Sequence, residues 1–364
     1  MARFVALAEA AERYVGLDVR NEERITASAR DLADECLEVE RFPRCSDAEY
    51  AHPQCPVIPF EPEAAIRWTS GLDLISRQHV WVPAVSACYG LANPLPAELF
   101  TPRISTGFAV HTDPLEAVVR GVLEVIERDA NAVLWLQQLP LPILDPAGLD
   151  HQVMQLVEWG RVRFMQVHLF DATSDLGVPT VYCLLCCPHD QRASRVVGAG
   201  SARDLATAAH KAILEAMSTP PLIHFTPESE DDRSPAGKRA AGDTARYLGR
   251  AEHSHAFDFL LHGPDRPAAP SRAPLPTDPL DALNVLISRL ADAGMRPVAV
   301  DRTTTELADV GLSAVNVVIP DLQPMSLDPL AQFTAHPRLY DAPARMGYRA
   351  LPLEELNPWP QPLG

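Results

Sequence analysis

The chain has 364 residues, 47% of them hydrophobic, and its 31 Lys and Arg against 48 Asp and Glu give a formal net charge of −17. This is the composition of a globular protein with enough chain to bury a core, and it excludes a disulfide-dependent miniprotein. Because binding of nucleic acid by phosphate neutralisation needs clustered Lys and Arg, the net negative charge also predicts that nucleic acid is not a partner.

Residue usage narrows the class of protein further. Neither of the two lysines, Lys211 and Lys238, lies in a G-x-x-x-x-G-K-[ST] string, which excludes a P-loop. Seven cysteines without paired spacing are typical of reduced thiols in the cytoplasm. Since Glu9 interrupts the first apolar stretch and no run approaches ~18 apolar residues, we expect a cytoplasmic protein with no signal peptide and no membrane association.

The first part of the chain predicts two helices separated by irregular segments. Apolar residues at helical spacing predict a helix over 3–16, and the acidic stretch 29–40 is either helical or irregular. Five prolines predict an irregular connector over 41–62, and the apolar run 80–85 predicts a strand. The clearest helix spans 114–137, because Asp-Pro-Leu-Glu at its start has an N-cap, a first-turn proline and a capping-box glutamate.

The second part predicts a mixture of strands and helices. Two apolar segments, 162–170 and 178–187, flank a turn and predict a hairpin. Further elements are predicted at 203–217 and 279–294 (helices) and at 297–301 and 314–320 (strands). The polar segment 226–278 predicts a surface excursion, and 352–364 is a proline-rich tail. Strands alternating unevenly with helices indicate a single α+β domain over 1–364, in which mixed sheets pack against helices.

One acidic string occurs twice, as Glu9-Ala-Ala-Glu12-Arg13 and as Glu124-Val-Ile-Glu127-Arg128, each within a predicted helix. Carboxylates three residues apart project from one side of a helix, about 60° from each other. Taken singly, such pairs are more often solvated ion pairs. The repetition favours an internal duplication whose helices pack about a local two-fold axis and bring four carboxylates together. Their repulsion would be relieved by Mg²⁺, which shares its ligands between carboxylates and phosphates, and the two arginines could hold phosphate oxygens.

Several segments resemble the YcaO family, and together they cover nearly the whole chain. They are Ala-Leu-Ala-Glu-Ala-Ala-Glu-Arg-Tyr at 6–14, Ser105-Thr-Gly-Phe-Ala, Leu-Glu-Ala-Val-Val-Arg-Gly-Val-Leu-Glu-Val-Ile-Glu-Arg-Asp-Ala at 115–130 and Val-Ile-Pro-Asp-Leu-Gln-Pro at 318–324. The second Glu-x-x-Glu-Arg helix with its flanks is the most specific part. The ending Pro358-Trp-Pro360-Gln-Pro362 resembles the Pro-x-Pro-x-Pro ending of the family's azoline-forming cyclodehydratase branch.

The resemblance implies a YcaO-like α+β fold and ATP-dependent activation of backbone amides in a ribosomally made precursor peptide. In that family a Cys, Ser or Thr side chain adds to the preceding carbonyl, ATP phosphorylates the oxyanion, and loss of phosphate leaves a thiazoline or oxazoline. By position it implies Mg²⁺ ligands and nucleotide contacts. The implied ligands are Glu9, Glu12, Glu124 and Glu127, with Glu116 helping at the nucleotide site and Arg128 and Arg13 contacting phosphates. The tail prolines Pro358, Pro360 and Pro362 are candidates for a contribution to catalysis.

The resemblance also implies partners. Since no leader-binding domain is recognised in the chain, we expect a leader-binding protein in trans, and since the family tends to dimerise, a homodimer. Ala6 and Thr112 stand where the family usually has Ser and Gln or Asn. Glu9 lies almost at the start of the chain, whereas family members have a further N-terminal segment. Three explanations remain open: a start further upstream, a part supplied by another chain, or impaired ATP binding.

Other interpretations of the sequence remain beside this one. A different nucleophile, such as sulfide, would give a thioamide, although the Pro-x-Pro-x-Pro tail disfavours it, and a non-catalytic scaffold would only present the precursor. Cys183-Leu-Leu-Cys186-Cys187 lies on an apolar strand, which favours buried structural cysteines over a metal site. Glu215 resembles part of a later family motif, Ala-Leu-x-Glu-Ala, and a structural ion pair is at least as consistent with it as a role in the site.

Overall fold

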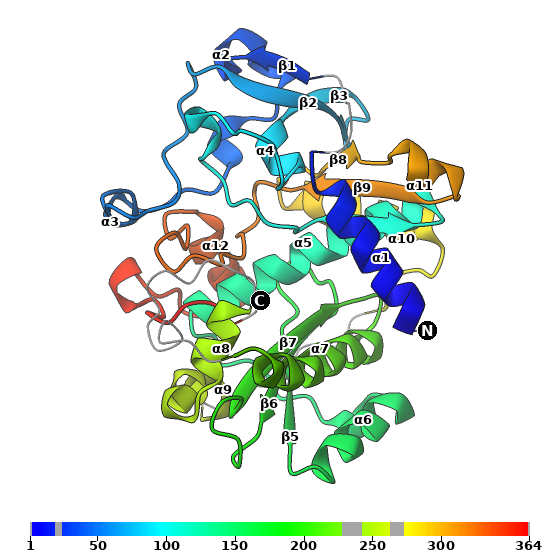
Figure 1. The fold of residues 1–364 in the computed structure, drawn as a ribbon, viewed down its shortest axis with the longest axis vertical. Coiled ribbons are helices and arrows are strands. Elements are labelled where there is room, and N and C mark those ends of the chain that lie inside the picture. The colour runs from blue at the N-terminus through cyan, green and yellow to red at the C-terminus, as the bar shows by residue number, and fades with distance from the viewer. Residues whose placement is uncertain (1, 19–23, 228–241, 263–272, 363–364) are drawn as a thin grey trace. The chain divides into compact units, whose positions relative to one another are not determined.

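The computed structural model describes residues 2–18, 24–227, 242–262 and 273–362. The chain divides into two compact units (Figure 1). Unit 1 comprises Met1–Ile126 and Pro276–Pro324, and unit 2 comprises Glu127–Leu275 and Met325–Gly364. Each unit has its own antiparallel sheet. The single domain over 1–364 stays a prediction.

Unit 1 is built on a six-stranded sheet with the order β1-β2-β8-β9-β4, in which β3 also pairs with β2. The strands are β1 (Arg24–Ala27), β2 (Ile66–Asp73), β3 (His79–Pro83), β4 (Phe108–His111), β8 (Val298–Asp301) and β9 (Ser313–Val318). Alternate residues such as Ile66 and Trp68, or Val80 and Val82, enter one buried cluster because side chains alternate along a strand. Strand β4 pairs with β9 and forms an edge of this sheet.

The helices of unit 1 include α1 (Ala2–Val15) and α10 (Pro279–Asp292), and α5 (Pro114–Leu136) begins here. Shorter helical segments are α2 (Ala29–Leu32), η1 (Ala33–Glu35), η2 (Val39–Arg41), α3 (Asp47–Tyr50), α4 (Ala84–Ala87), η3 (Pro96–Glu98) and α11 (Thr305–Asp309). The predicted helices over 3–16, 114–137 and 279–294 are thereby confirmed. The strands predicted at 80–85, 297–301 and 314–320 correspond to β3, β8 and β9.

Helix α5 starts as its sequence predicts, because the Oδ1 atom of Asp113 accepts the N–H groups of Leu115 and Glu116 at 2.9 and 3.3 Å. The N–H of Asp113 donates to Nδ1 of His111 at 3.0 Å. The helix continues without interruption across the boundary between the two units, which falls after Ile126. It therefore supplies side chains to both.

Unit 2 contains a three-stranded sheet of β5 (Gln166–Asp171), β6 (Thr180–Cys186) and β7 (Arg195–Ser201), with β7 at one edge. The predicted hairpin is confirmed as β5 and β6. Helix α7 (Leu205–Phe225) lies across one face of this sheet (Figure 1). The close approach requires glycine in β7, because a Cβ atom at Gly198 would lie 2.3 Å from the carbonyl oxygen of Ala212. Helix α7 also extends beyond the predicted 203–217, through Pro220 and Pro221.

The remaining elements of unit 2 are η4 (Pro146–Gly148), α6 (His151–Arg161), α8 (Asp243–Gly249), η6 (Ala251–Phe257), α9 (Asp258–Leu261), α12 (Arg338–Arg345) and η7 (Leu353–Glu355). The structure differs from the surface excursion predicted over 226–278. Within 242–262, Leu248 and Phe257 are fully buried, and the Phe257 ring packs 5.2 Å from that of Trp135. Residues 228–241 and 263–272 of the predicted excursion lie outside the described residues.

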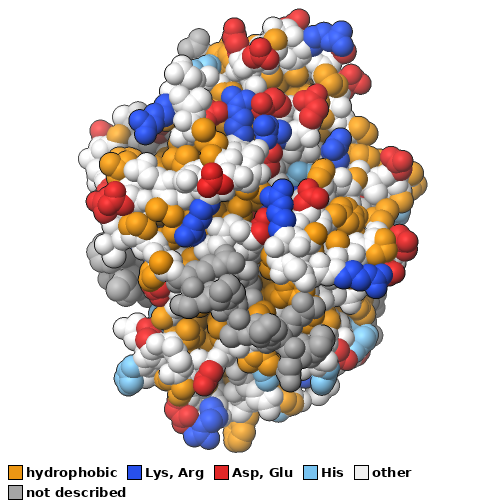
Figure 2. All heavy atoms as spheres, turned by 180° about the vertical axis from the view of Figure 1, so that it is seen from behind, with side chains coloured by type: hydrophobic (Ala, Val, Ile, Leu, Met, Phe, Trp, Pro, Cys, Tyr) orange, Lys and Arg blue, Asp and Glu red, His pale blue; other side chains and the backbone are white. Residues whose placement is uncertain are grey.

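The surface of the chain carries charges of both signs. On the face in Figure 2, Lys and Arg side chains are interspersed with Asp and Glu side chains rather than gathered by sign. No helix among the described residues is both long enough and apolar enough to span a bilayer.

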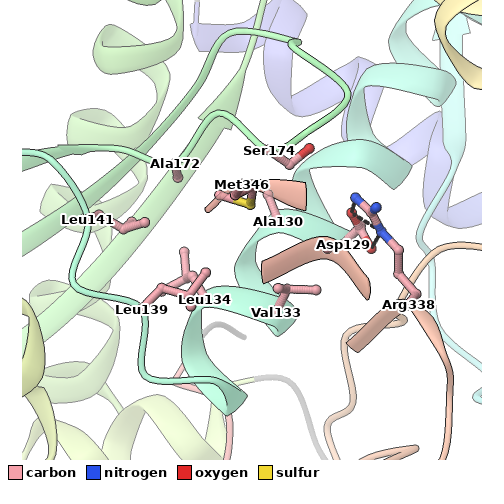
Figure 3. A pocket seen from close by; sticks show the side chains of 11 residues that line it. Asp129, Ala130, Val133, Leu134, Leu139, Leu141, Ala172, Ser174, Arg338 and Met346 are labelled. Carbon is pink, nitrogen blue, oxygen red and sulfur yellow. Dashed lines mark hydrogen bonds and ion pairs between the residues drawn. The ribbon is translucent and has the colours of Figure 1, made fainter. Parts of the chain in front are cut away.

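A buried ion-pair network ties α12 to α5 within unit 2. Arg338 donates to both carboxylate oxygens of Asp129, at 2.7 Å from Nη2 to Oδ2, and its Nη1 donates to Asp175 at 2.9 Å. Figure 3 shows a cavity beside this ion pair, walled mainly by apolar side chains including Val133, Leu134 and Met346. Because both partners of the ion pair are buried, neither charge can be hydrated if the other is removed.

We therefore expect Arg338→Met to lower the free energy of unfolding of unit 2 by about 3–5 kcal/mol, because it removes the guanidinium that compensates the buried charges of Asp129 and Asp175. Urea denaturation followed by circular dichroism measures the effect. The matched control is Arg349→Met, which removes an ion pair with Glu355 whose arginine side chain is 77% exposed, and should leave the curve unchanged. Equal curves for the two variants would contradict the assignment.

Candidate functional site

Two of the glutamates predicted as metal ligands form hydrogen bonds with the backbone at the edge of the sheet in unit 1. The Oε1 atom of Glu12, from α1, accepts the N–H of Val110 in β4 at 3.3 Å. The Oε2 atom of Glu124, from α5, accepts the N–H of Gly107 just before β4 at 3.1 Å. Backbone N–H groups along a sheet edge need an acceptor, and a carboxylate is a strong one. Two helices that are far apart in sequence thus place one carboxylate each on the same short segment.

The turn before β4 is shaped to present the N–H group that Glu124 accepts. Gly107 has a φ of +86°, and a Cβ atom there would lie 2.1 Å from the carbonyl oxygen of Val317. The N–H of Val317 donates to the Gly107 carbonyl at 2.8 Å, and Nδ2 of Asn316 donates to the Thr106 carbonyl at 3.2 Å. Any side chain at position 107 would push the turn away from β9 and displace the N–H group.

Unit 2 repeats this arrangement on its own edge strand. The Oε2 atom of Glu127, from α5, accepts the N–H of Ser201 at 2.6 Å. The Oε2 atom of Glu215, from α7, accepts the N–H of Ala199 at 2.6 Å. Both N–H groups belong to β7. In each unit, then, two helices deliver one carboxylate each to the backbone of an edge strand or of the turn just before it, and α5 supplies one carboxylate to each unit.

Burial makes the charged form of two of these carboxylates unfavourable. Loss of hydration raises the pKa of Glu12, and the negative charge of Glu9 raises it further. Loss of hydration also raises the pKa of Glu215, against the lowering effect of the Arg128 charge and with a further rise from Glu127. A cation bound at these carboxylates would reverse both effects, because an opposite charge favours ionisation.

The remaining predicted residues of unit 1 take different positions. Glu9 is exposed and acts on Glu12 through its charge. Arg13 is also exposed, and its Nη1 donates to Oγ of Ser105 at 2.9 Å. The carboxylate of Glu116 is buried and accepts from Nε of Arg120 at 3.0 Å. The charge of Arg120 in turn acts on Glu12, so Glu116 holds an arginine near the carboxylates of unit 1.

Arg128 lies among the carboxylates of unit 2. Its Nη2 atom is 3.8 Å from Oε1 of Glu127, and its charge lowers the pKa of Glu215. Its Nη1 donates to the sulfur of Met325 at 3.9 Å. A guanidinium beside two carboxylates suits the binding of phosphate oxygens that would share a cation with them.

The carboxylate oxygens of these glutamates are the kind of ligand that Mg²⁺ prefers when it is bound together with phosphate. Among the described residues, no group of three or more His, Cys, Asp or Glu side chains is arranged to hold a metal ion. Within each unit the structure shows a pair of carboxylates. Because Mg²⁺ usually takes one or two protein carboxylates and completes its six ligands with water and phosphate oxygens, carboxylate pairs fit a magnesium–nucleotide complex.

The structure adds one residue whose role the sequence left open. The carboxylate of Glu215 shares β7 with that of Glu127, and Nζ of Lys211, one turn earlier in α7, donates to the Ser201 carbonyl at 3.1 Å. The available signal was the i, i+4 pair of Lys211 and Glu215 in the Ala-rich first half of α7. The three cysteines at 183, 186 and 187 are buried, as predicted.

A family model described as YcaO cyclodehydratase, ATP- and Mg²⁺-binding, matches residues 1–323. The chain belongs to the YcaO family. An uncharacterized protein of Methanothermobacter thermautotrophicus is 28% identical, over 90% of this chain and 80% of its own length. A solved heterocyclase in complex with substrate and cofactor superposes with a TM-score of 0.82 at 25% identity, over 98% of this chain and 48% of its own. The heterocyclase TruD gives a TM-score of 0.80 at 22% identity, over 100% of this chain and 50% of its own.

These comparisons confirm the predicted family and the predicted α+β fold. The predicted cofactors, ATP and Mg²⁺, and the predicted enzyme class, an ATP-dependent cyclodehydratase, agree with the description of the family. The chain spans about half the length of the two solved heterocyclases it matches.

The raised pKa of Glu215 has a consequence for stability. Between the unfolded pKa and the higher folded pKa, the folded state binds more protons, so stability falls as the pH rises through this window and the penalty persists above it. We expect Glu215→Gln, which keeps an acceptor for Ala199, to be more stable than the wild type at pH 7 and equal to it at pH 4. Urea midpoints at the two pH values, without metal or nucleotide, measure this. A difference independent of pH would show that ionisation of Glu215 is not its origin.

Proposed function

We propose that the protein is an ATP- and Mg²⁺-dependent cyclodehydratase that converts Cys, Ser or Thr residues of a precursor peptide to thiazolines or oxazolines. The observation that carries this is the pair of carboxylates held by two helices on the edge strand of each sheet, in a chain of the YcaO family. Phosphoryl transfer depends mainly on positioning the phosphoryl group and neutralising its negative charge. Carboxylates that hold a metal ion and arginines that bind phosphate oxygens can supply both.

We assign the protein's own groups as follows. When bound, magnesium–ATP supplies the phosphoryl group that the activated amide oxygen accepts. The proposed metal-binding carboxylates are Glu12 and Glu124 in unit 1 and Glu127 and Glu215 in unit 2. Arg128 would bind phosphate oxygens, and Glu116 would orient Arg120 toward the carboxylates of unit 1. Glu9 and Arg13 are exposed and would complete the site from α1.

The proposed partners follow from the chemistry. The substrate would be a ribosomally made precursor peptide, and a solved heterocyclase similar to this chain is described in complex with its substrate. We further propose a leader-binding protein in trans and a homodimer. The place of action would be the cytoplasm, where ATP is available and the seven cysteines stay reduced.

We propose that the tail at 352–362 completes the site by docking on the last turns of α5. Nε1 of Trp135 donates to the Trp359 carbonyl at 2.9 Å, and the Asn357 N–H donates to the Leu136 carbonyl at 2.8 Å. Nε2 of Gln361 donates to Oε1 of Gln332 at 2.8 Å. Pro358, Pro360 and Pro362 carry no group that transfers protons or binds metal. Their proposed contribution is a fixed backbone φ that keeps this extended path.

The central experiment combines the protein with ATP, Mg²⁺, a candidate precursor and a leader-binding protein, and measures the mass of the peptide. Each azoline formed removes one water, a loss of about 18 Da, and Glu124→Gln and Glu127→Gln should each lower the rate at least ~100-fold by weakening transition-state electrostatics. Glu158→Gln, at an exposed carboxylate in α6, is the matched control. Magnesium–ATP binding that is equal in all variants by calorimetry would contradict the proposal and favour a scaffold, and thioamide formation would show as a gain in mass.

Tail docking has a separate test. Trp135→Phe removes the N–H donor to the Trp359 carbonyl but keeps an aromatic ring beside Phe257. We expect the rate of azoline formation to fall about 10-fold, equivalent to one lost hydrogen bond, while magnesium–ATP affinity stays unchanged. Steady-state kinetics and calorimetry on the same preparation check both values. A loss of nucleotide affinity would instead indicate that α5 itself is disturbed.

A further inference from the structure

A fully buried arginine holds the end of helix α1 in unit 1. Arg302 is 0% exposed, and its Nε and Nη2 atoms donate to the Val15 carbonyl at 3.1 and 2.9 Å. The Nη2 atom also donates to the Leu17 carbonyl at 3.2 Å. Carbonyls at the C-terminal end of a helix have no partner within the helix, and the helix dipole favours a positive charge there. Arg302 therefore satisfies the end of α1 with a charge that is itself hydrogen-bonded, as a buried charge must be.

Helix α1 has little apolar packing that could hold it instead. Of residues 6–15, the part of the helix whose side-chain exposure is described, only the last is buried. Two further contacts to the backbone lie at the same end of the helix. The Tyr89 hydroxyl donates to the Arg13 carbonyl at 2.9 Å, and the Gly90 N–H donates to the Gly16 carbonyl at 2.9 Å. The position of α1 on unit 1 therefore depends largely on polar contacts at its C-terminal end.

The arginine itself is fixed in the sheet of unit 1. Arg302 directly follows β8, and its N–H donates to the Ala314 carbonyl of β9 at 2.8 Å. Glu12 precedes Val15 by three residues, which is about 4.5 Å along the helix. Its hydrogen bond to the Val110 N–H is 3.3 Å long, so a small displacement of α1 would break it. Arg302 thus links the sheet to the helical turn from which Glu12 projects.

We propose that Arg302 is a positioning residue of the site in unit 1. It fixes the C-terminal turn of α1 and thereby holds the Glu12 carboxylate at β4, where it would bind the metal. The proposal rests on the proposed function. The guanidinium acts through the backbone of α1 and touches neither metal nor nucleotide. Arginine suits this role because its planar fork donates to two carbonyls at once and keeps its charge, whereas lysine offers a single ammonium group.

The first test follows backbone amides of unit 1 and needs no activity. Hydrogen exchange is measured by NMR on the protein without metal or nucleotide. We expect the Val110 amide to exchange at least ~10-fold faster in Arg302→Met than in the wild type, because Glu12 no longer stays at β4. The Gly107 amide, whose N–H Glu124 accepts, is the internal control and should exchange as in the wild type.

Two further variants make this result specific. Arg41→Met is the matched control, because Arg41 of unit 1 also donates beyond a helix end, from Nη1 to the Gly294 carbonyl after α10 at 3.0 Å, and α10 carries no proposed ligand. It should leave exchange at Val110 unchanged. Arg302→Lys keeps the charge and covers the case in which methionine prevents folding. It should still raise exchange at Val110 about 3-fold, because one ammonium group cannot replace the fork.

Two results of the exchange experiment overturn the proposal. One is unchanged exchange at Val110 in a folded Arg302 variant, which would show that α1 keeps its place without the arginine. The other is an equal rise at Val110 and Gly107, which would describe a general loss of stability.

The second test is a double-mutant cycle with azoline formation as its readout. We expect Arg302→Met to lower the rate about 10-fold in the wild type and to have no further effect in Glu12→Gln, because a residue that acts through Glu12 loses its influence once that carboxylate is gone. Losses that multiply in the double variant overturn the proposal. If the wild type forms no azoline, the proposed function fails, while the exchange of the Val110 amide still decides the role of Arg302.

Discussion

The hydrogen bond between a helix carboxylate and a backbone N–H at a sheet edge is the interaction on which the candidate site residues of each unit depend. An edge strand exposes donors that need acceptors, and a buried carboxylate needs donors that compensate its lost hydration. Pairing the two solves both problems and fixes the carboxylate in place. The raised pKa of Glu12 and of Glu215 shows that the compensation is incomplete. A cation bound beside these carboxylates would lower that remaining unfavourable energy, which is why we propose them as metal ligands.

The scaffold around these contacts explains several otherwise unfavourable residue choices. Gly107 is needed where the turn before β4 passes against β9, and Gly198 where α7 crosses β7. Arg338 and Asp129 form a buried ion pair that links α12 to α5 within unit 2. A site that relies on positioned charges needs such rigidity more than it needs maximal stability.

Much of the fold was predictable where local signals are strong. The sequence of helix α5 shows an N-cap residue, a first-turn proline and apolar residues at helical spacing. Strands β5 and β6 are two apolar segments on either side of a turn. The strands that hold the carboxylates were not predicted: β4 has only four residues, and the glycines of β7 look like turn residues until α7 is seen to need them. Because these strands were not predicted, the sequence could not distinguish Glu12 from Glu9. Glu12 differs from Glu9 in accepting an N–H of β4, and Glu215 is identified as a candidate because it accepts an N–H of β7.

Helix α5 is continuous, and its Glu124 accepts the N–H of Gly107 while its Glu127 accepts the N–H of Ser201. The number of residues between the two glutamates therefore matters for both contacts. Inserting a single residue between these two positions would rotate the second carboxylate by about 100° and shift it by about 1.5 Å. From residue 121 onward every residue of α5 is buried or half-buried, and a change in its length between the two glutamates cannot be absorbed by a loop. Insertions and deletions among descendants of this chain should therefore concentrate outside that turn.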